Sequence, residues 1–212
     1  MFITVEGVEG SGKSTLLKAL AAVLEAQNIP CLVTREPGGS KLGQELRPLL
    51  LRTKSNMDAR AELFLFLADR AQHIREVIRP ALDNGTWVLC DRYADSTLAY
   101  QGYGRGMNLE LLEQCNHAAT DGLWPDCTFL LDLPVDEGLK RALTRNRDIG
   151  ISQSEGRFEA EALAFHQRVR EGFLARAARW PQRFAVLDAR QSPEDLLKQA
   201  LTHLEKTVPG IR

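Results

Sequence analysis

Residues 7–14 read GVEGSGKS, which places three glycines ahead of a lysine and a serine. The run fits the pattern G-x-x-x-x-G-K-[ST], whose glycines let the backbone turn tightly and approach a ligand closely because they lack a Cβ. Backbone N–H groups in such a turn form a concave nest for anions. Lys13 can reach the β- and γ-phosphates of a nucleotide, and the Ser14 hydroxyl can bind Mg²⁺. The stretch therefore predicts a site for a nucleoside triphosphate with Mg²⁺.

The flanking segments agree with this prediction. A β-rich run at 2–5 precedes the glycines and a helical pattern at 16–24 follows them, so the phosphates would sit at a helix N-terminus, which favours anions. The motif by itself does not identify the reaction. The predicted ATP-binding residues of this stretch are Gly7, Val8, Glu9, Gly10, Ser11, Gly12, Lys13, Ser14 and Thr15.

Two aspartates follow apolar runs that read as buried strands, and either can be the acidic partner of Mg²⁺. Asp91 follows residues 87–90 and Asp132 follows residues 128–131. A helix or turn cap is the alternative role for both. We favour Asp91, because the adjacent Arg92 supplies the phosphate-facing cation that such a cleft needs. The predicted metal ligands are Ser14 and Asp91.

An aromatic and a basic side chain share one face of the helical pattern at 57–82. Phe66 and Arg70 are four positions apart, with His73 one turn further. A flat ring and a fork-shaped donor can stack on a base and hydrogen-bond to it. The alternative, with Phe66 in the core and Arg70 at a solvated edge, stays open because the spacing does not decide. The four histidines lack the spacing of a metal site: His73, His117, His166 and His203.

Several arginines surround a polar, glycine-containing segment at about 146–157. A solvated helix face is one explanation and nucleic-acid binding is another, but the interleaved acidic residues would repel a polyanion. The third is a mobile lid whose arginines close over transferring phosphates, and the phosphate-binding motif favours it. The arginines are Arg141, Arg145, Arg147 and Arg157, and the acidic residues are Asp148, Glu155, Glu159 and Glu161.

The bulk composition is that of an ordinary soluble protein. The chain has 212 residues, 44% hydrophobic and 26% charged, with a net charge of −1. This balance argues against general nucleic-acid binding. The sequence has no cleavable secretory pattern and no apolar run of membrane-spanning length. Its four cysteines form no C-x-x-C pair, which fits reduced thiols in a cytoplasmic protein.

Strand and helix patterns alternate along the whole chain. This order predicts right-handed crossovers, and thus an α/β fold with a mostly parallel five-stranded sheet in a three-layer α/β/α arrangement. We expect one domain over 1–212, with ligands at the carboxyl ends of the strands. The expected strands are 2–5, 30–34, 87–90, 128–131 and 184–187, and the expected helices are 16–24, 41–51, 57–82, 109–119, 137–143, 159–178 and 193–204.

The assembled motifs resemble the thymidylate kinase family of the bacterial type. The resemblance lies in EGVEGSGKS at 6–14, TREPGG at 34–39, DRY at 91–93 followed by STLAYQG at 96–102, and LLDL at 130–133. It covers nearly the whole chain and implies a P-loop NTPase fold. The implied reaction is ATP + dTMP → ADP + dTDP, on the path to dTTP. The resemblance also implies a homodimer formed through helices near 57–82 and 109–119.

The resemblance further implies roles for residues of the acceptor site. Glu9 would accept the 3′-hydroxyl, Phe66 would stack on thymine and Arg70 would donate to its O4. Thr97 would meet the N3 edge, while Tyr100 would lie under the sugar and disfavour a 2′-hydroxyl. The residues expected to complete this pocket or to surround the acceptor phosphate are Gln101, Arg35, Glu36, Arg47 and Arg92.

For the donor, the resemblance implies that Lys13, Ser14 and Asp91 hold the ATP phosphates and Mg²⁺. Arg190 and Gln191 would lie near adenine. Some family members carry a catalytic arginine inside the phosphate loop; here Ser11 stands before Gly12, so the chain resembles the class that uses lid arginines instead. The predicted catalytic residues are Lys13, Arg92, Arg147 and Arg157.

Two other functions remain open at this level. A kinase for a different nucleoside monophosphate would share the loop and the lid and differ in the base pocket. A nucleotide-dependent switch would need its own base-recognition motif, and the nearest approach to N-K-x-D, at 146–148, lacks the lysine. The generic loop alone supports a switch.

Overall fold

The computed structural model describes residues 1–52, 56–148 and 156–208, apart from the side chains of residues 145–148. Its centre is one five-stranded sheet with the order β2-β3-β1-β4-β5, and all four strand pairings are parallel. The strands are β1 (Phe2–Glu6), β2 (Cys31–Arg35), β3 (Trp87–Asp91), β4 (Cys127–Asp132) and β5 (Phe184–Asp188). The predicted α/β class with a parallel five-stranded sheet is confirmed.

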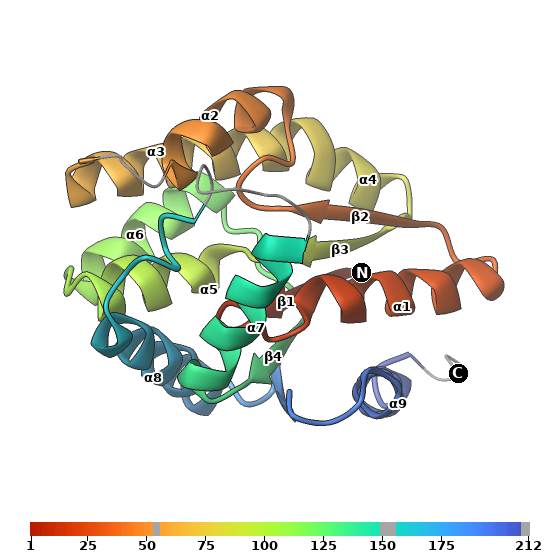
Figure 1. Ribbon diagram of the computed structural model, residues 1–212. Coiled ribbons are helices and arrows are strands. Elements are labelled where there is room, and N and C mark those ends of the chain that lie inside the picture. The colour runs from red at the N-terminus through yellow and green to blue at the C-terminus, as the bar shows by residue number, and fades with distance from the viewer. Residues whose placement is uncertain (53–55, 149–155, 209–212) are drawn as a thin grey trace.

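Helices cover both faces of the sheet (Figure 1). The helix α1 (Lys13–Ala26) contacts β1, β2 and β3 and packs against α9 (Pro193–Glu205), which contacts β5. Elsewhere α4 (Arg79–Asp83) contacts β3, and α8 (Leu163–Arg179) contacts β4 and β5. The remaining helical elements are α2 (Lys41–Leu51), α3 (Ala59–His73), η1 (Ile74–Ile78), α5 (Ala94–Thr97), η2 (Leu98–Gly104), α6 (Leu109–Thr120) and α7 (Val135–Asp148).

The core explains why the strands read as continuous apolar runs. All five residues of β1 are buried, as are the first five of β4, because helices lie on both sides of these central strands. Ile3, Val5 and Phe129 are fully buried. No helix in the part of the chain that the structure describes is long and apolar enough to cross a bilayer.

The predicted helix at 57–82 forms, but it is not uniform. It consists of α3, the π-helical turn η1 and α4 in direct succession. Pro80, in the first turn of α4, has no N–H to donate, and its ring would crowd the preceding turn of a regular α-helix. The wider turn just before it accommodates the proline.

The segment after β3 also differs from the sequence-based expectation. The expected helices include none of the glycine-containing residues 98–106, whereas Leu98–Gly104 is π-helical and continues the short helix α5. Six of its seven residues are buried. The expectation was wrong because tertiary packing overrides the low helix propensity of glycine: a Cβ on Gly104 would meet the Phe165 ring at 2.6 Å.

Candidate functional site

The phosphate loop connects the buried strand β1 to α1 at the carboxyl edge of the sheet. Gly7, Gly10 and Gly12 have φ values of 140°, 72° and 94°, which glycine adopts at no steric cost. Close packing adds a second requirement, since a Cβ on Gly10 would lie 2.1 Å from the Gly138 carbonyl oxygen of α7. The loop is therefore pressed against the start of α7, the helix that leads toward the predicted lid.

Lys13 lies folded over its own loop. Its Nζ donates to the carbonyl oxygens of Gly7 (3.1 Å) and Val8 (2.8 Å). Burial, and next the Arg92 guanidinium, lower the pKa of Lys13 to about 8. Nζ is thus held at the loop by carbonyl oxygens, which a phosphate can replace as partners.

The two predicted metal ligands meet. The Ser14 Oγ donates to Asp91 Oδ2 at 2.8 Å, so a hydroxyl and a carboxylate converge beside the phosphate loop. The alternative, Asp132, is held by Arg170 of α8 at 2.7 and 2.8 Å. Among the described residues, no group of three or more His, Cys, Asp or Glu side chains is placed to bind a metal ion. A small oxygen donor set suits Mg²⁺, which keeps several waters and binds substrate phosphates.

One cavity of about 640 Å³ runs from the phosphate loop to the base-binding candidates. Most of the predicted site residues line it, from both the donor and the acceptor sets. The predicted residues on its wall are Glu9, Gly10, Gly12, Lys13, Ser14, Thr15, Arg35, Glu36, Arg47, Phe66, Arg70, Asp91, Arg92, Thr97, Tyr100 and Gln101. The wall also includes residues that the sequence reasoning did not assign to it: Pro37, Leu51, Tyr93, Ser96, Arg141, Phe158 and Glu159.

Arg92 and Glu9 face each other in the middle of this cavity. The Arg92 Nη2 donates to Glu9 Oε1 at 3.1 Å, its Nη1 donates to Ser96 Oγ at 3.3 Å, and its guanidinium lies 4.9 Å from the Tyr100 ring centroid. The Tyr100 hydroxyl donates to the same Glu9 oxygen. Burial alone would raise the pKa of Glu9, but His166, Arg92 and Lys13 outweigh it and hold the pKa below its usual range.

The buried carboxylate of Glu6 fixes the turn that carries Arg92, and the sequence reasoning missed it. Oε1 accepts from the Tyr93 N–H at 2.8 Å, and Oε2 accepts from Ser96 Oγ at 2.6 Å. Arg92, directly before Tyr93, has a φ of +69°, which is uncommon outside glycine. A glutamate that ends an apolar strand beside the phosphate loop is the one sequence signal for this role.

Glu6 also predicts a pH dependence of stability. Burial, opposed by Arg92, raises its pKa from 4.5 to about 7. Between these values the folded protein holds a proton that the unfolded chain has lost, so this contribution is fully present below pH 4.5 and is lost as the pH rises through about 7. Relative to Glu6→Gln, wild type should lose about 3 kcal/mol of unfolding free energy over that range.

Urea unfolding at a series of pH values measures this difference. Glu25→Gln, a change at an exposed position on α1, is the matched control. If the free energies of wild type and Glu6→Gln run parallel across the whole range, Glu6 does not titrate as described.

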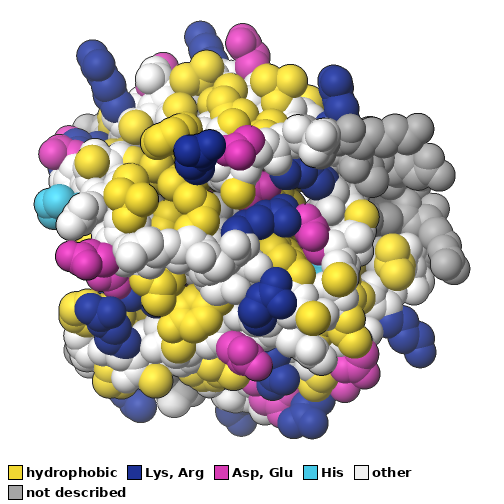
Figure 2. Space-filling view, turned by 90° about the vertical axis from the view of Figure 1, so that its left-hand side faces the viewer, with side chains coloured by type: hydrophobic (Ala, Val, Ile, Leu, Met, Phe, Trp, Pro, Cys, Tyr) yellow, Lys and Arg dark blue, Asp and Glu magenta, His cyan; other side chains and the backbone are white. Residues whose placement is uncertain are grey.

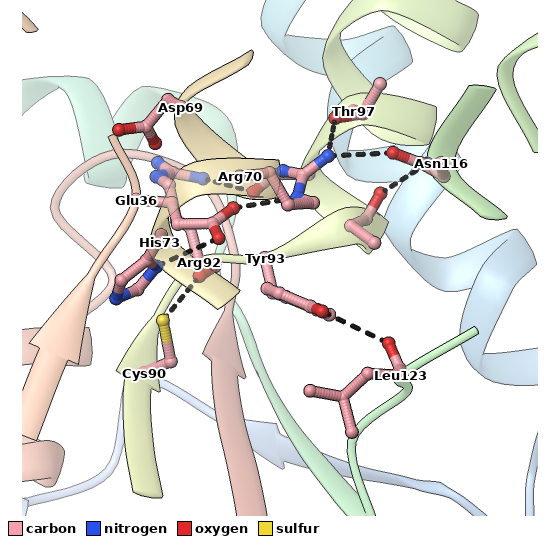
Figure 3. Close-up of polar contacts among 12 residues, drawn as sticks. Glu36, Asp69, Arg70, His73, Cys90, Arg92, Tyr93, Thr97, Asn116 and Leu123 are labelled. Atoms are coloured by element: carbon pink, nitrogen blue, oxygen red, sulfur yellow. Dashed lines mark hydrogen bonds and ion pairs between the residues drawn. The ribbon is translucent and has the colours of Figure 1, made fainter. Parts of the chain in front are cut away.

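At the far end of the cavity, Arg70 is buried in a polar network (Figure 3). Its Nε donates to Glu36 Oε2 at 2.8 Å, and its Nη1 donates to Thr97 Oγ1 (2.8 Å) and to Asn116 Oδ1 (2.7 Å). The other Glu36 oxygen lies 3.1 Å from His73 Nδ1. Arg70 is therefore buried, and the alternative that places it at a solvated edge is wrong. Glu36 contacts Arg70 and His73, whereas the resemblance implies that it lies around the acceptor phosphate.

Phe66 lies beside this network on the cavity wall, partly buried. Its ring centroid is 6.3 Å from that of Phe158, and Phe158 in turn meets Tyr100 edge-on at 5.3 Å. An aromatic face next to a fixed guanidinium can stack on a flat heterocycle and donate to its carbonyl. Asn116 accepts from the same Arg70 nitrogen as Thr97, and no pattern in the sequence indicates this role.

Of the two predicted lid arginines, the structure describes the side chain of Arg157 alone. Arg157 is buried, and its guanidinium donates to Leu50 O at 3.2 Å and pairs with Glu62 at 2.7 Å. Arg105 and Gln101 bind the same Glu62 carboxylate. Arg147 is in the last turn of α7, but its side chain lies outside the described part of the structure, as do residues 149–155 of the predicted lid.

The predicted adenine contacts lie beyond β5. Arg190 is exposed and pairs with Asp188 at 2.8 Å, and Gln191 binds Gln199. Neither residue is on the cavity wall. Arg141, which is on the wall, donates to the Ala189 carbonyl oxygen at 3.0 Å and so joins α7 to this turn.

Comparisons with known proteins agree with this geometry. A family model described as thymidylate kinase matches residues 5–200. The curated thymidylate kinase of Desulfovibrio desulfuricans is 57% identical over 97% of this chain and 95% of its own length. That of Solidesulfovibrio magneticus is 59% identical over 92% and 93%. The crystal structure of thymidylate kinase from Ehrlichia chaffeensis is similar, with a TM-score of 0.76, 33% identity and coverage of 96% and 98%.

These matches extend over the phosphate loop, the Arg70 network and the Arg92 turn, which are the parts that meet in the cavity. By its sequence and its fold, the chain belongs to the thymidylate kinase family.

Proposed function

We propose that this chain transfers the γ-phosphoryl group of ATP to dTMP, giving ADP and dTDP for dTTP synthesis, with Mg²⁺ as the metal. The observation that carries the proposal is the single cavity that has a phosphate loop at one end and the buried Arg70 network at the other. Two nucleotides bound end to end in it would bring their phosphates together near Arg92.

The chemistry needs no general base. The second pKa of a phosphate monoester is about 6, so the attacking oxygen of dTMP is largely ionised at neutral pH. The barrier is instead the repulsion between two anions and their alignment. Lys13 and Arg92 supply positive charge at the donor and the middle of the cavity, respectively. Mg²⁺, when bound, would neutralise further charge on the ATP phosphates, and Ser14 and Asp91 would hold it.

At the acceptor end, the contacts of Arg70 and Tyr100 support the roles proposed for them. The Glu36 carboxylate and the Thr97 hydroxyl hold Arg70 in place to donate to a carbonyl of the base. Phe66 would stack on thymine. Tyr100 is fixed through its hydroxyl by Glu9 and would pack under the sugar, where a 2′-hydroxyl would clash. Arg35, Arg47 and Arg92 would surround the acceptor phosphate.

An ADP-release assay tests the proposal. The purified protein is supplied with ATP, Mg²⁺ and one nucleoside monophosphate at a time, and release should be fastest with dTMP. A clear preference for GMP, AMP or CMP would reject the thymine pocket. Slow hydrolysis that dTMP does not accelerate would instead favour a nucleotide switch. Omitting Mg²⁺ should abolish release.

We further infer that the chain acts in the cytoplasm as one domain with a lid at 146–157, and that it forms a homodimer without nucleic acid. Apolar side chains gather on the side of the molecule that is at the left in Figure 1 (Figure 2). On α3 and α6, Phe64 is 62% exposed and Leu111 is 49% exposed. Such a face is typical of an interface between subunits. Sedimentation velocity should give the mass of a dimer, and a monomer at micromolar concentration would contradict this.

A further inference from the structure

A histidine that the proposed mechanism does not use lies against the sugar-binding carboxylate. His166 is near the start of α8 and is fully buried. Its Nδ1 is 3.3 Å from Glu9 Oε2. Within the described part of the chain, neither ring nitrogen of His166 nor this oxygen has a well-aligned hydrogen-bond partner. Buried polar atoms left unpaired cost free energy, so the pair calls for an explanation.

The two oxygens of Glu9 have different surroundings. Oε1 is occupied, because the Tyr100 hydroxyl and the Arg92 guanidinium both donate to it. Oε2 accepts from neither group and has less than 1 Å² of exposed surface, so a ligand hydroxyl reaches it only when a neighbouring side chain moves aside. A carboxylate oxygen has two lone pairs, so Oε2 can accept from one imidazole N–H and from one hydroxyl of a bound nucleotide at the same time.

The position of His166 is well defined by packing. Its ring meets the Phe165 ring edge-on, with centroids 5.4 Å apart, and Phe165 packs edge-on against Tyr100 at 6.2 Å. The helix α8 is thereby joined to η2, the element that carries Tyr100. Tyr100, which donates to Glu9 Oε1, and His166, whose Nδ1 lies 3.3 Å from Oε2, thus belong to one packed unit.

We propose that His166 is a positioning residue for acceptor selection: its Nδ1–H holds Glu9 Oε2 in the orientation that accepts the 3′-hydroxyl of the deoxyribose. The proposal rests on the proposed function, in which Glu9 meets that hydroxyl. It predicts that His166 matters for nucleotides with a 3′-hydroxyl and not for those without one.

The test compares dTMP with 3′-deoxythymidine monophosphate as acceptors. His166→Phe keeps the ring volume and removes both nitrogens. It should raise the KM for dTMP about tenfold, as expected for the loss of a hydrogen bond to a charged group, and leave the KM for the 3′-deoxy nucleotide within about twofold. His166→Asn places an amide N–H near the position of Nδ1 and should restore most of the affinity for dTMP.

A merely structural role would give different results. If His166→Phe raises the KM for both nucleotides equally, or for neither, the proposal is wrong. It is also wrong if the asparagine variant binds dTMP no better than the phenylalanine variant. Glu9→Gln separates this from the underlying assignment: if that variant does not favour the 3′-deoxy nucleotide relative to wild type, Glu9 does not meet the 3′-hydroxyl, whatever the His166 variants do.

Discussion

Replacing Arg92 with alanine should lower kcat for dTMP phosphorylation on the order of 10³-fold. The guanidinium is the cation at the centre of the cavity, where Glu9, Ser96 and the Tyr100 ring fix its position. A preorganised positive charge stabilises the phosphoryl group in transfer because it does not have to reorganise during the reaction. The KM for dTMP should rise as well, since the acceptor phosphate would lie against the same group.

Steady-state kinetics with ATP and dTMP measure the effect. Arg92→Lys keeps the charge but loses the fork that reaches both Glu9 and Ser96, so it should recover only part of the activity. Arg60→Ala, at a side chain that is 78% exposed, is the control and should be indistinguishable from wild type. A kcat for Arg92→Ala within about fivefold of wild type would remove Arg92 from the catalytic set.

The two predicted lid arginines should behave differently from each other. By analogy with arginine fingers, loss of the lid arginine that reaches the phosphates should cost on the order of 10³ in kcat. Arg157 is already bound to the buried Glu62 and to the Leu50 carbonyl oxygen, which makes it an anchor for the segment before α8. We therefore expect the large kinetic loss in Arg147→Ala and mainly a loss of stability in Arg157→Ala, because Glu62 would lose a buried partner.

Kinetics and thermal melts of both variants distinguish the roles. Glu62→Gln is the matched partner variant, and combining it with Arg157→Ala should give less than the sum of the two stability losses, since the residues share one interaction. A 10³-fold loss in Arg157→Ala with a normal melt would reverse the assignment. If both arginine variants retain kcat within a few-fold of wild type, neither arginine serves as the catalytic lid residue.

The sequence by itself determined the features that depend on local pattern. GVEGSGKS predicts a loop whose geometry follows from the absence of Cβ atoms, and the structure has positive φ at Gly7, Gly10 and Gly12. The alternation of apolar strands with helices predicts a parallel sheet, and a parallel sheet brings the ends of its strands to one edge. For this reason the sequence predicts that Asp91 or Asp132 lies beside Ser14, and the adjacent Arg92 favours Asp91. Ser14 and Asp91 meet at 2.8 Å.

Only the tertiary structure decided which partners the buried polar side chains have. The spacing of Phe66 and Arg70 could not exclude a solvated arginine, because Glu36 and Asn116 lie 34 and 46 positions away in the chain. The contact between His166 and Glu9 likewise joins α8 to the phosphate loop. Such pairings have no periodic signature in the sequence. They exist because a charge taken out of water must find a partner wherever the fold brings one within reach.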